Sequence, residues 1–474
     1  MKLYKILILF LSAGLLVFHS CERDSNKPDL PEDVLILNHW IWDVMNEVYL
    51  WENQLPDLDP DYQPDPMQYF YDLLYEEDHY SWIVDNYDEL EALFDGVEFV
   101  TGMSALPWLY TDTRVLYTVE FVTPGSPAED AGIKRGDLIV AIDGQSITID
   151  NYYELYSQAT ATYEFGEWNG DTVLASGRKI TLTAIDLNQN PVVHSEIIDF
   201  QGKKIGYLVY TQFTAGADDE WYDELNNVFQ EFKSEGVSDV VFDLRYNRGG
   251  MLELAAYIAS TLGPRTAMEN EDVFSYLVWN DFYNDFWKEY DADNDGKPDG
   301  DESEILVMRL PHSDLNLDLS KIYFLTTGST ASASESLIVG LYPYTDVVQI
   351  GTTTYGKCYG SWTIPDYAEP KRHNWAMQPI VLKYSNAEGF TNFVDGIDPD
   401  YEIYENLLEL EPFGSMEDPL LAKALEEITG VQPVRKGTAL PEREFIPMPL
   451  PEKRVPEFIS DLPVRAEGKL RSTD

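Results

Sequence analysis

The chain has 474 residues, 44% of them hydrophobic, which is enough for two or three globular domains and too much for one compact fold. Asp and Glu total 84 against 32 Lys and Arg, so the formal net charge is −52. Such a charge repels phosphate backbones and anionic lipid headgroups. The composition therefore argues against nucleic acid as a partner and against direct binding to a membrane surface.

The N-terminus has the pattern of an export signal. Basic residues precede an apolar run over 6–18, which is too short to span a bilayer comfortably, and the sequence turns polar after Cys21. A cysteine directly after such a run resembles the acylation site of bacterial lipoproteins. We therefore expect a lipoprotein signal peptide over 1–21 with an acylated Cys21, then a polar tether over 22–34. The expected location is the cell envelope, with the chain held to a bacterial membrane only through this lipid; the alternative is a plain secretory signal.

Residues 35–95 favour a small helical domain. Aromatic and aliphatic residues recur there at helical spacing and glycines are few. The clearest members of this stripe are Trp40, Val44, Val48 and Trp51. Such a stripe is typical of packing rather than of a binding surface.

Residues 96–190 change to short β-branched and aromatic runs broken by Gly and Pro, which predicts a β-rich domain. The string FVTPGSPAEDAGIKRGDLIVAIDGQSI within it resembles the PDZ domain. By this resemblance, a peptide carboxy-terminus adds as a strand beside the residues preceding Leu116. Its carboxylate is held by the backbone amides of Gly102, Met103, Ser104, Ala105 and Leu106. The alternative is a PDZ-like module that only packs against its neighbour.

Residues 200–430 alternate predicted strands and helices, which favours a mixed or parallel sheet flanked by helices. KIGYLVY, SDVVFDLR, IYFLTT and VVQIG are the expected strands. The overall fold class is therefore α/β in the sense of an α+β multidomain chain, with a helical domain, a PDZ-like domain and a mixed-sheet core. Residues 431–474 are rich in proline without periodicity, which predicts an extended, poorly packed tail.

A serine near a helix start and a lysine in a glycine-bounded loop are the chemically suggestive pair. Ser332 lies in a run of small residues where a helix N-terminus offers unpaired amides. Lys357 follows an apolar strand, and a desolvated lysine can replace histidine as a base because burial lowers its pKa. Composition alone does not separate Ser332 from the neighbouring serines, and a serine-rich helix start also suits a cap. Cys358 is an alternative nucleophile, but no neighbouring histidine supports it.

The strings STASASES and TTTYGK together are similar to the carboxyl-terminal processing, or tail-specific, peptidase family. This resemblance implies a serine endopeptidase with Ser332 as nucleophile and Lys357 as general base, acting on protein or peptide substrates near flexible C-termini, with no cofactor for catalysis. The string DLRYNRGG resembles the family's oxyanion turn. It implicates the amide of Ala333 with that of Gly249 or Gly250, and it does not decide between the two glycines.

The chain departs from the family where the lysine is oriented. Many relatives carry Gln four residues after the catalytic lysine, whereas this chain has Ser361, whose hydroxyl reaches less far. Ser361 is therefore the candidate for orienting Lys357. The competing hypothesis is a catalytically weak or inactive peptide-binding envelope lipoprotein on the same scaffold. A third hypothesis, suggested by the 11 Trp and 31 Tyr, is a carbohydrate- or polymer-binding lipoprotein.

The string DADNDGKPDGDE over 291–302 has the spacing of a calcium loop. Five carboxylates so close together repel one another without a cation, and Gly296 permits the sharp turn that the ligands need. The expected ligands of a structural Ca²⁺ ion are Asp291, Asp293, Asp295, Lys297, Asp299 and Glu302. The alternative is a solvated acidic loop.

Overall fold

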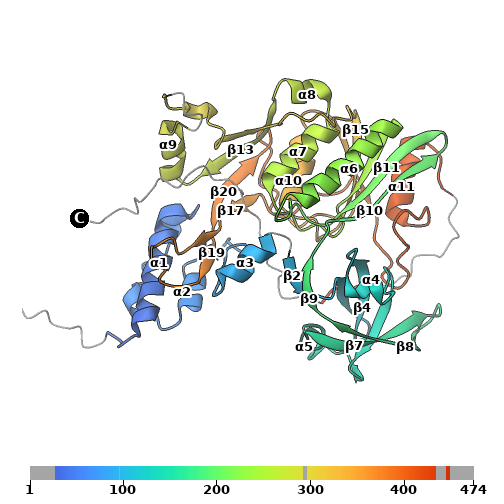
Figure 1. Cartoon of the computed structure of the whole chain (residues 1–474), viewed down its shortest axis with the longest axis horizontal. Coiled ribbons are helices and arrows are strands. Elements are labelled where there is room, and N and C mark those ends of the chain that lie inside the picture. Colours follow the sequence, from blue (N-terminus) through green and yellow to red (C-terminus); the bar gives the residue numbers. More distant parts are fainter. Residues whose placement is uncertain (1–26, 95–96, 292–295, 434–444, 449–474) are drawn as a thin grey trace, which may run out of the picture.

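The computed structural model describes residues 27–94, 97–291, 296–433 and 445–448. A helical region at the N-terminus and a β-rich PDZ-like part lie beside a larger α/β core (Figure 1). The expected α/β multidomain class is thereby confirmed. Within these ranges, no helix is both long and apolar enough to cross a bilayer.

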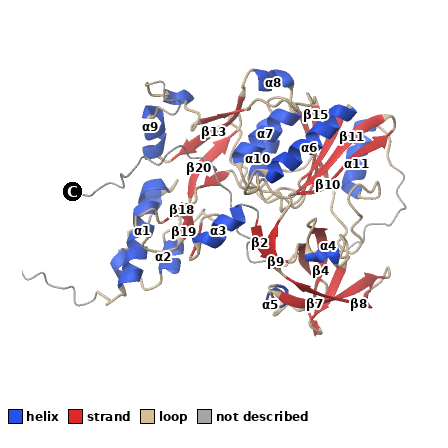
Figure 2. Ribbon diagram, viewed as in Figure 1, coloured by secondary structure: helices blue, strands red, loops and turns tan. Residues whose placement is uncertain are grey.

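A six-stranded mixed sheet forms the centre of the core (Figure 2). Its strand order is β10 (Val192–Phe200), β11 (Lys203–Tyr210), β12 (Asp239–Asp243), β15 (Lys321–Thr326), β16 (Asp346–Gly351) and β21 (Tyr401–Glu402). β10 pairs antiparallel with β11, and all the other pairs are parallel. The carboxyl ends of β12, β15 and β16 therefore meet at one edge, where functional residues gather in such folds.

Helices cover both faces of this sheet, as its strand sequences require. Val240 and Phe242 of β12 point into the apolar cluster that contains the helices α6 (Glu220–Glu235), α7 (Leu252–Leu262) and α10 (Ala333–Leu341). Val241 points to the opposite face, where α11 (Pro419–Thr429) packs. Because successive side chains of a strand alternate between faces, a continuous apolar run is buried on both sides.

A second, antiparallel sheet carries the loop that follows β16. Its order is β14 (Val307–Arg309), β13 (Val273–Trp279), β20 (Ile380–Ser385) and β17 (Tyr359–Ser361). β17 begins two residues after Lys357. The sheet therefore brings the lysine loop back toward α10, and helix α9 (Asp281–Glu289) packs on it.

The N-terminal helices pack closely on the core. The helices α1 (Glu32–Val48) and α2 (Pro66–Asp72) share one apolar cluster with the core. The prediction of an all-helical segment missed β1 (Trp82–Val84), which pairs antiparallel with β19 (Ala376–Gln378), itself paired with β18 (Ile364–Pro365). Helix α1 ends at Val48, so Trp51 lies beyond the helix that its spacing predicted.

The PDZ-like part is a separate sheet with its own core. Its order is β3 (Met103–Leu109), β4 (Val115–Val122), β5 (Leu138–Ile142), β7 (Thr160–Trp168) and β8 (Val173–Thr183), with the short β6 (Gln145–Ser146) on β5. Two short helices, α4 (Pro127–Asp130) and α5 (Tyr152–Tyr156), complete it. β2 (Val97–Val100) pairs with β9 (Ile185–Asn188) where the chain enters and leaves. Leu116 lies inside β4, so the strand at the sheet edge is β3 itself.

A buried cation ties the PDZ-like part to the core. Arg135 donates to the hydroxyl of Tyr246 at 2.6 Å, to a carboxylate oxygen of Glu405 at 2.6 Å and to the carbonyl of Glu411 at 2.8 Å. Glu405 also accepts from the fully buried Arg245 at 2.7 Å. Buried charges persist only when paired and hydrogen-bonded. This network therefore fixes how the PDZ-like part sits on the core.

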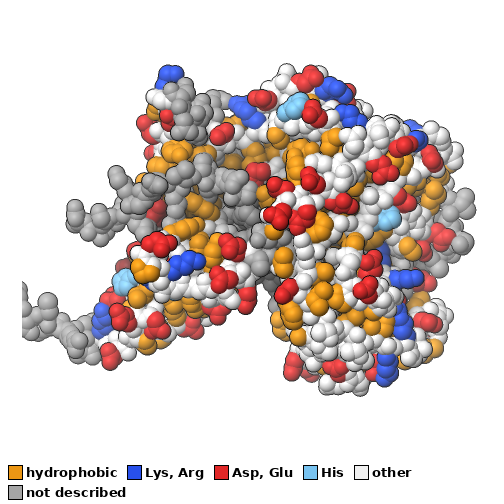
Figure 3. Space-filling model, in the orientation of Figure 1, with side chains coloured by type: hydrophobic (Ala, Val, Ile, Leu, Met, Phe, Trp, Pro, Cys, Tyr) orange, Lys and Arg blue, Asp and Glu red, His pale blue; other side chains and the backbone are white. Residues whose placement is uncertain are grey.

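The acidic side chains are spread over every part of the visible surface (Figure 3). Basic side chains appear on it as small separate spots. On this face the large net charge is thus distributed rather than concentrated in one binding patch.

Candidate active site

Ser332 stands at the start of α10 in a strained backbone conformation. β15 ends at Thr326, and the loop after it delivers Ser332 as the N-cap of α10 with φ 53° and ψ −109°. A serine at positive φ outside the allowed left-handed region costs on the order of 1–3 kcal/mol and persists only where its surroundings impose it. Its side chain is 1% exposed. The strain therefore requires strong contacts around this residue.

The turn after β12 lies directly against Ser332. The carbonyl of Asn247 accepts from the amide of Ala331 and from the hydroxyl of Ser334, both at 3.1 Å. A Cβ placed on Gly249 would approach the Cβ of Ser332 to 3.0 Å, and the φ of Gly249 is 107°. Only glycine satisfies both requirements. The turn and the helix start thus form one contact surface.

Three backbone amides lie at this contact. Ala333 is the first residue of α10, where helix geometry leaves amides without an intrahelical acceptor. The amide of Gly249 donates to Oδ1 of Asn247 at 2.9 Å. The amide of Gly250 has no acceptor among the residues that the structure describes. The sequence did not decide which of the two glycines donates to the oxyanion. Because the amide of Gly249 already has an acceptor, the amide of Gly250 is the one available to a ligand.

Lys357 lies in the loop between β16 and β17 and is 6% exposed. Its Nζ is 5.4 Å from the ring centroid of Tyr80, within cation–π range. The hydroxyl of Tyr80 donates to the carbonyl of Gly356 at 3.0 Å. Tyr80 belongs to the N-terminal region, so that region forms part of the wall around the lysine.

The carboxylate of Glu335 connects the two candidate catalytic segments. One oxygen accepts the amides of Ser332 and Lys357, both at 2.8 Å. The other accepts the amide of Gly356 at 2.7 Å and the hydroxyl of Thr354. Four donors from the helix start and from the lysine loop therefore converge on one fully buried side chain.

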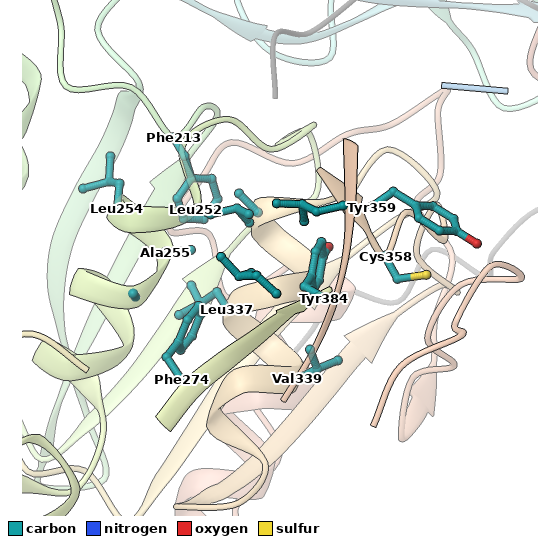
Figure 4. Packing of buried hydrophobic residues seen from close by; sticks show 14 of the residues in the cluster. Phe213, Leu252, Leu254, Ala255, Phe274, Leu337, Val339, Cys358, Tyr359 and Tyr384 are labelled. Carbon is teal, nitrogen blue, oxygen red and sulfur yellow. The ribbon is translucent and has the colours of Figure 1, made fainter. Parts of the chain in front are cut away.

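The hydroxyl of Tyr384, on β20, makes the complementary contact to carbonyl groups. It lies 2.6 Å from the carbonyl oxygen of Lys357 and 3.1 Å from that of Ser332. Figure 4 shows Tyr384 in the same buried cluster as Leu337 of α10 and Cys358. The peptide groups of Ser332 and Lys357 are thus held by a shared acceptor and a shared donor.

Burial raises the pKa of Glu335 to about 7, and its four hydrogen bonds act in the opposite direction. Desolvation of a carboxylate outweighs them because the site excludes water. Sequence reasoning missed this residue. The signal was present, since Ser332 followed three residues later by Glu335 is a capping box at a helix start. No local pattern marks Tyr80 or Tyr384, which lie far from the motifs in sequence.

The other predicted residues fall in different places. Cys358 is fully buried in the core cluster, and burial raises the pKa of its thiol, which disfavours it as a nucleophile. Ser361 is buried at the end of β17, and its role in orienting Lys357 stays a prediction. Gly102 precedes β3, far along the chain from this site, and Met103 to Leu106 lie within β3.

The predicted calcium loop is described only in part. Asp293, Asp295 and the side chain of Glu302 lie outside the described residues, as do Cys21 and most of the predicted tail. Asp291 accepts the amide of Gly296 at 2.8 Å, and the amide of Asp299 donates to the carbonyl of Tyr290 at 3.0 Å. No cluster of three potential metal ligands occurs among the side chains that are described.

Comparison with known proteins gives three family matches. Residues 204–403 match peptidase family S41, residues 37–82 match the peptidase S41 N-terminal domain, and residues 118–162 match the PDZ domain. The S41 match spans the turn after β12, Ser332 and Lys357. All the elements that build the candidate site in the core therefore lie inside it.

Two curated relatives are both named carboxyl-terminal-processing protease. A carboxyl-terminal-processing protease of Picosynechococcus is 27% identical over 319 residues, which is 66% of this chain and 66% of that protein. One of Synechocystis is 25% identical over 335 residues, 68% of each chain. The chain thus spans about two thirds of the length of these relatives.

A crystal structure gives a longer match. A Bacteroides fragilis protein assigned to the S41 proteases superposes with a TM-score of 0.67 at 30% identity. The match covers 82% of this chain and 97% of that one. The likeness therefore extends across the helical region, the PDZ-like part and the core together.

Replacing Glu335 with glutamine should change how stability depends on pH. The parent carboxyl has a pKa of about 7 in the fold against 4.5 as its ordinary value. Because the folded state binds this proton more tightly, the group contributes stability at low pH that is lost as pH rises from about 4.5 to 7. Glu335→Gln lacks this loss, so relative to the parent it should gain about 3 kcal/mol over that interval.

Urea unfolding of both chains at several pH values between 4.5 and 7.5 measures the difference. The same substitution at the exposed Glu388 is the control and should leave the pH dependence as in the parent. A difference between parent and Glu335→Gln that stays constant with pH would contradict the assignment.

Proposed function

The chain belongs to peptidase family S41, and from this premise we propose that it is a serine endopeptidase in which Ser332 attacks the peptide carbonyl and Lys357 accepts the hydroxyl proton. The observation that carries the proposal is the pair of shared contacts at Glu335 and Tyr384, which fix the backbones of Ser332 and Lys357 to each other. A nucleophile and its base need such fixed relative geometry.

The proposed reaction proceeds through two acyl transfers. The hydroxyl oxygen of Ser332 bonds to the carbonyl carbon while its proton passes to the neutral amine of Lys357. The amides of Ala333 and Gly250 donate to the oxygen that becomes negatively charged. The lysine ammonium then protonates the leaving amine, and a water molecule releases the acyl group by the same steps in reverse roles.

The surroundings of Lys357 support its role as base. A lysine acts as a base only when its amine is held within reach of the proton that it accepts. Tyr80 and the loop itself bury the side chain to 6% exposure. We propose that Tyr80 and Ser361 together orient the amine, in place of the glutamine that many relatives carry.

The proposed substrates are proteins or peptides with flexible C-terminal regions. The curated relatives are named carboxyl-terminal-processing proteases, and the PDZ match supplies a module of the kind that takes peptide termini. The second candidate function is peptide binding with catalysis weakened or lost. It is favoured by Ser361 at the orienting position, four residues after Lys357.

Cleavage of an unstructured polypeptide separates these two candidates. We expect the chain without residues 1–21 to cleave it, and Ser332→Ala or Lys357→Met to lower kcat/KM by about 1,000-fold or more, because each removes a group that acts only in the transition state. Cys358→Ala is the matched control and should retain activity within a few-fold. No cleavage by the parent, or equal cleavage by all the chains, would exclude the proposed mechanism.

We also propose that the loop over 291–302 binds a structural calcium ion. The spacing of its carboxylates supports this, as does the bond from the amide of Gly296 to Asp291, which curls the chain back on its first carboxylate. Asp291, Asp293, Asp295, Asp299 and Glu302 would provide side-chain oxygens and Lys297 its carbonyl. The ion would offset the mutual repulsion of the carboxylates and has no part in the chemistry at Ser332.

Calcium titration tests this site. We expect millimolar calcium to bind, by calorimetry, and to raise the Tm by a few degrees, since a ligand that binds only the folded state stabilises it. Asp291→Ala should abolish both effects. Asp301→Asn is the control, because Asp301 is highly exposed and pairs with Lys288 rather than occupying a ligand position. An unchanged Tm with no heat of binding would identify a plain acidic loop.

We propose that the chain is exported and anchored through a lipid on Cys21, facing the periplasm or the outside. The apolar run over 6–18 followed by this cysteine supports the proposal. Labelled palmitate should be incorporated into the full chain expressed in a bacterium and into Cys358→Ala, but not into Cys21→Ser. Labelling that survives Cys21→Ser would refute it.

A further inference from the structure

The outer edge of β3 in the PDZ-like part is paired with a segment from near the C-terminus of the chain. The amide of Leu109 donates to the carbonyl of Ile446, and the amide of Met448 donates to the carbonyl of Pro107, both at 2.9 Å. Trp108 is the antiparallel partner of Pro447. Residues 445–448, which composition predicted to be poorly packed, therefore extend the PDZ-like sheet by one short strand.

Two side chains of this segment anchor it on opposite faces of the sheet. The ring of Phe445 meets that of Trp108 edge to face with centroids 5.1 Å apart. Met448 packs on the core of the PDZ-like part, on the cluster that includes residues of α5. Ile446, between them, leaves 50% of its surface exposed. Residues 446 and 448 lie on one face of the extended segment and residue 445 on the other, so each face of the sheet receives one anchoring side chain.

One further group on the outer edge of β3 is also occupied within the chain. The hydroxyl of Tyr156, from α5, donates to the carbonyl of Met103 at 2.8 Å. Its ring stacks on Tyr117 at 4.6 Å. The carbonyl of Met103, in the stretch predicted to hold a peptide carboxylate, thus already has an internal partner. Residues 445–448 cover the outer edge of β3 from Pro107 to Leu109.

Pro447 shows that the segment is suited to an outermost position. Its neighbours Ile446 and Met448 make the bonds to β3, so the nitrogen of residue 447 faces away from the sheet. Proline has no N–H to offer there, which prevents a further strand from pairing outside it. The segment both fills the edge and closes it.

We propose that residues 445–448 are an intramolecular ligand of the β3 edge, and that an external peptide binds the PDZ-like part by strand addition only when it displaces them. A segment on the same chain competes at an effective concentration on the order of millimolar. External ligands of the same class carry an aromatic residue and, three positions later, an unbranched apolar one. This inference concerns binding alone and does not depend on the proposed peptidase activity.

Displacement of residues 445–448 also changes contacts at the junction with the core. Phe445 packs on an apolar cluster that contains Leu116 and Leu138 of the PDZ-like sheet together with Leu407 and Leu408 of the core. The hydroxyl of Thr118 in the same region donates to the carbonyl of Leu407 at 2.8 Å. An external peptide that replaces Phe445 therefore replaces a residue at the junction between the two parts.

Peptide binding to the full chain tests the proposal. The probe is a fluorescein-labelled peptide with the sequence of residues 443–450, and all chains carry Ser332→Ala so that hydrolysis plays no part. We expect Phe445→Ala combined with Met448→Ala to bind the probe about tenfold or more tightly than the parent, by fluorescence anisotropy. Ile446→Ala, which removes only an exposed side chain, should bind as the parent does. Equal affinity of the double variant and the parent overturns the proposal.

Amide hydrogen exchange provides a second measurement. In the double variant the amide of Leu109 should exchange faster because its acceptor, the carbonyl of Ile446, has left, whereas the amides of β12 should exchange as in the parent. Unchanged protection of Leu109 overturns the proposal. Faster exchange throughout β12 would mean that the segment is a structural part of the whole fold, and would overturn it as well.

Discussion

The site depends on the hydrogen bonds that the buried carboxylate of Glu335 accepts. It accepts hydrogen bonds from the helix start that bears Ser332 and from the loop that bears Lys357. Removing a carboxylate from water is costly, and burial accordingly raises its pKa to about 7. The four donors offset part of that cost, and they do so only when the two segments lie in this arrangement. The burial of Glu335 therefore favours the one arrangement in which the segments that bear Ser332 and Lys357 both donate hydrogen bonds to it.

The other groups around Ser332 and Lys357 come from distant parts of the chain. Tyr384 lies on the second sheet, Asn247 in the turn after β12, and Tyr80 in the N-terminal region. The strained φ of Ser332 costs on the order of 1–3 kcal/mol, and the contacts of its amide with Glu335 and of its carbonyl with Tyr384 hold it in place. The N-terminal helices share one apolar cluster with the core, and Tyr80 packs against this cluster.

The PDZ-like part is attached to the core by both polar and apolar contacts. Its own core is separate, and a network of buried charges centred on Arg135, Glu405 and Arg245 joins it to the larger sheet. Such networks hold a defined orientation through geometry more than through net stability. Next to them, the apolar cluster around Trp108 receives Phe445. Strand addition at β3 and the position of the PDZ-like part on the core therefore involve adjacent residues.

Local chemistry was readable from the sequence. The spacing of apolar residues predicted β11, β12, β15 and β16 and the helices between them. This spacing repeats within a few residues of each helix or strand, so it can be read from the local sequence. The paired motifs at Ser332 and Lys357 named the candidate catalytic residues through a family resemblance, and the capping box pointed to Glu335 although it was not recognised as such.

Only the tertiary structure decided the contacts between distant segments. The pairing of β1 with β19, the approach of Tyr80 to Lys357 and of Tyr384 to Ser332, and the strand formed by residues 445–448 on β3 leave no local pattern. Proline-rich composition predicted an unpacked tail because composition reports the average tendency of a segment. Two backbone hydrogen bonds and two apolar side chains were sufficient to order four of its residues, because an open sheet edge was already in place to receive them.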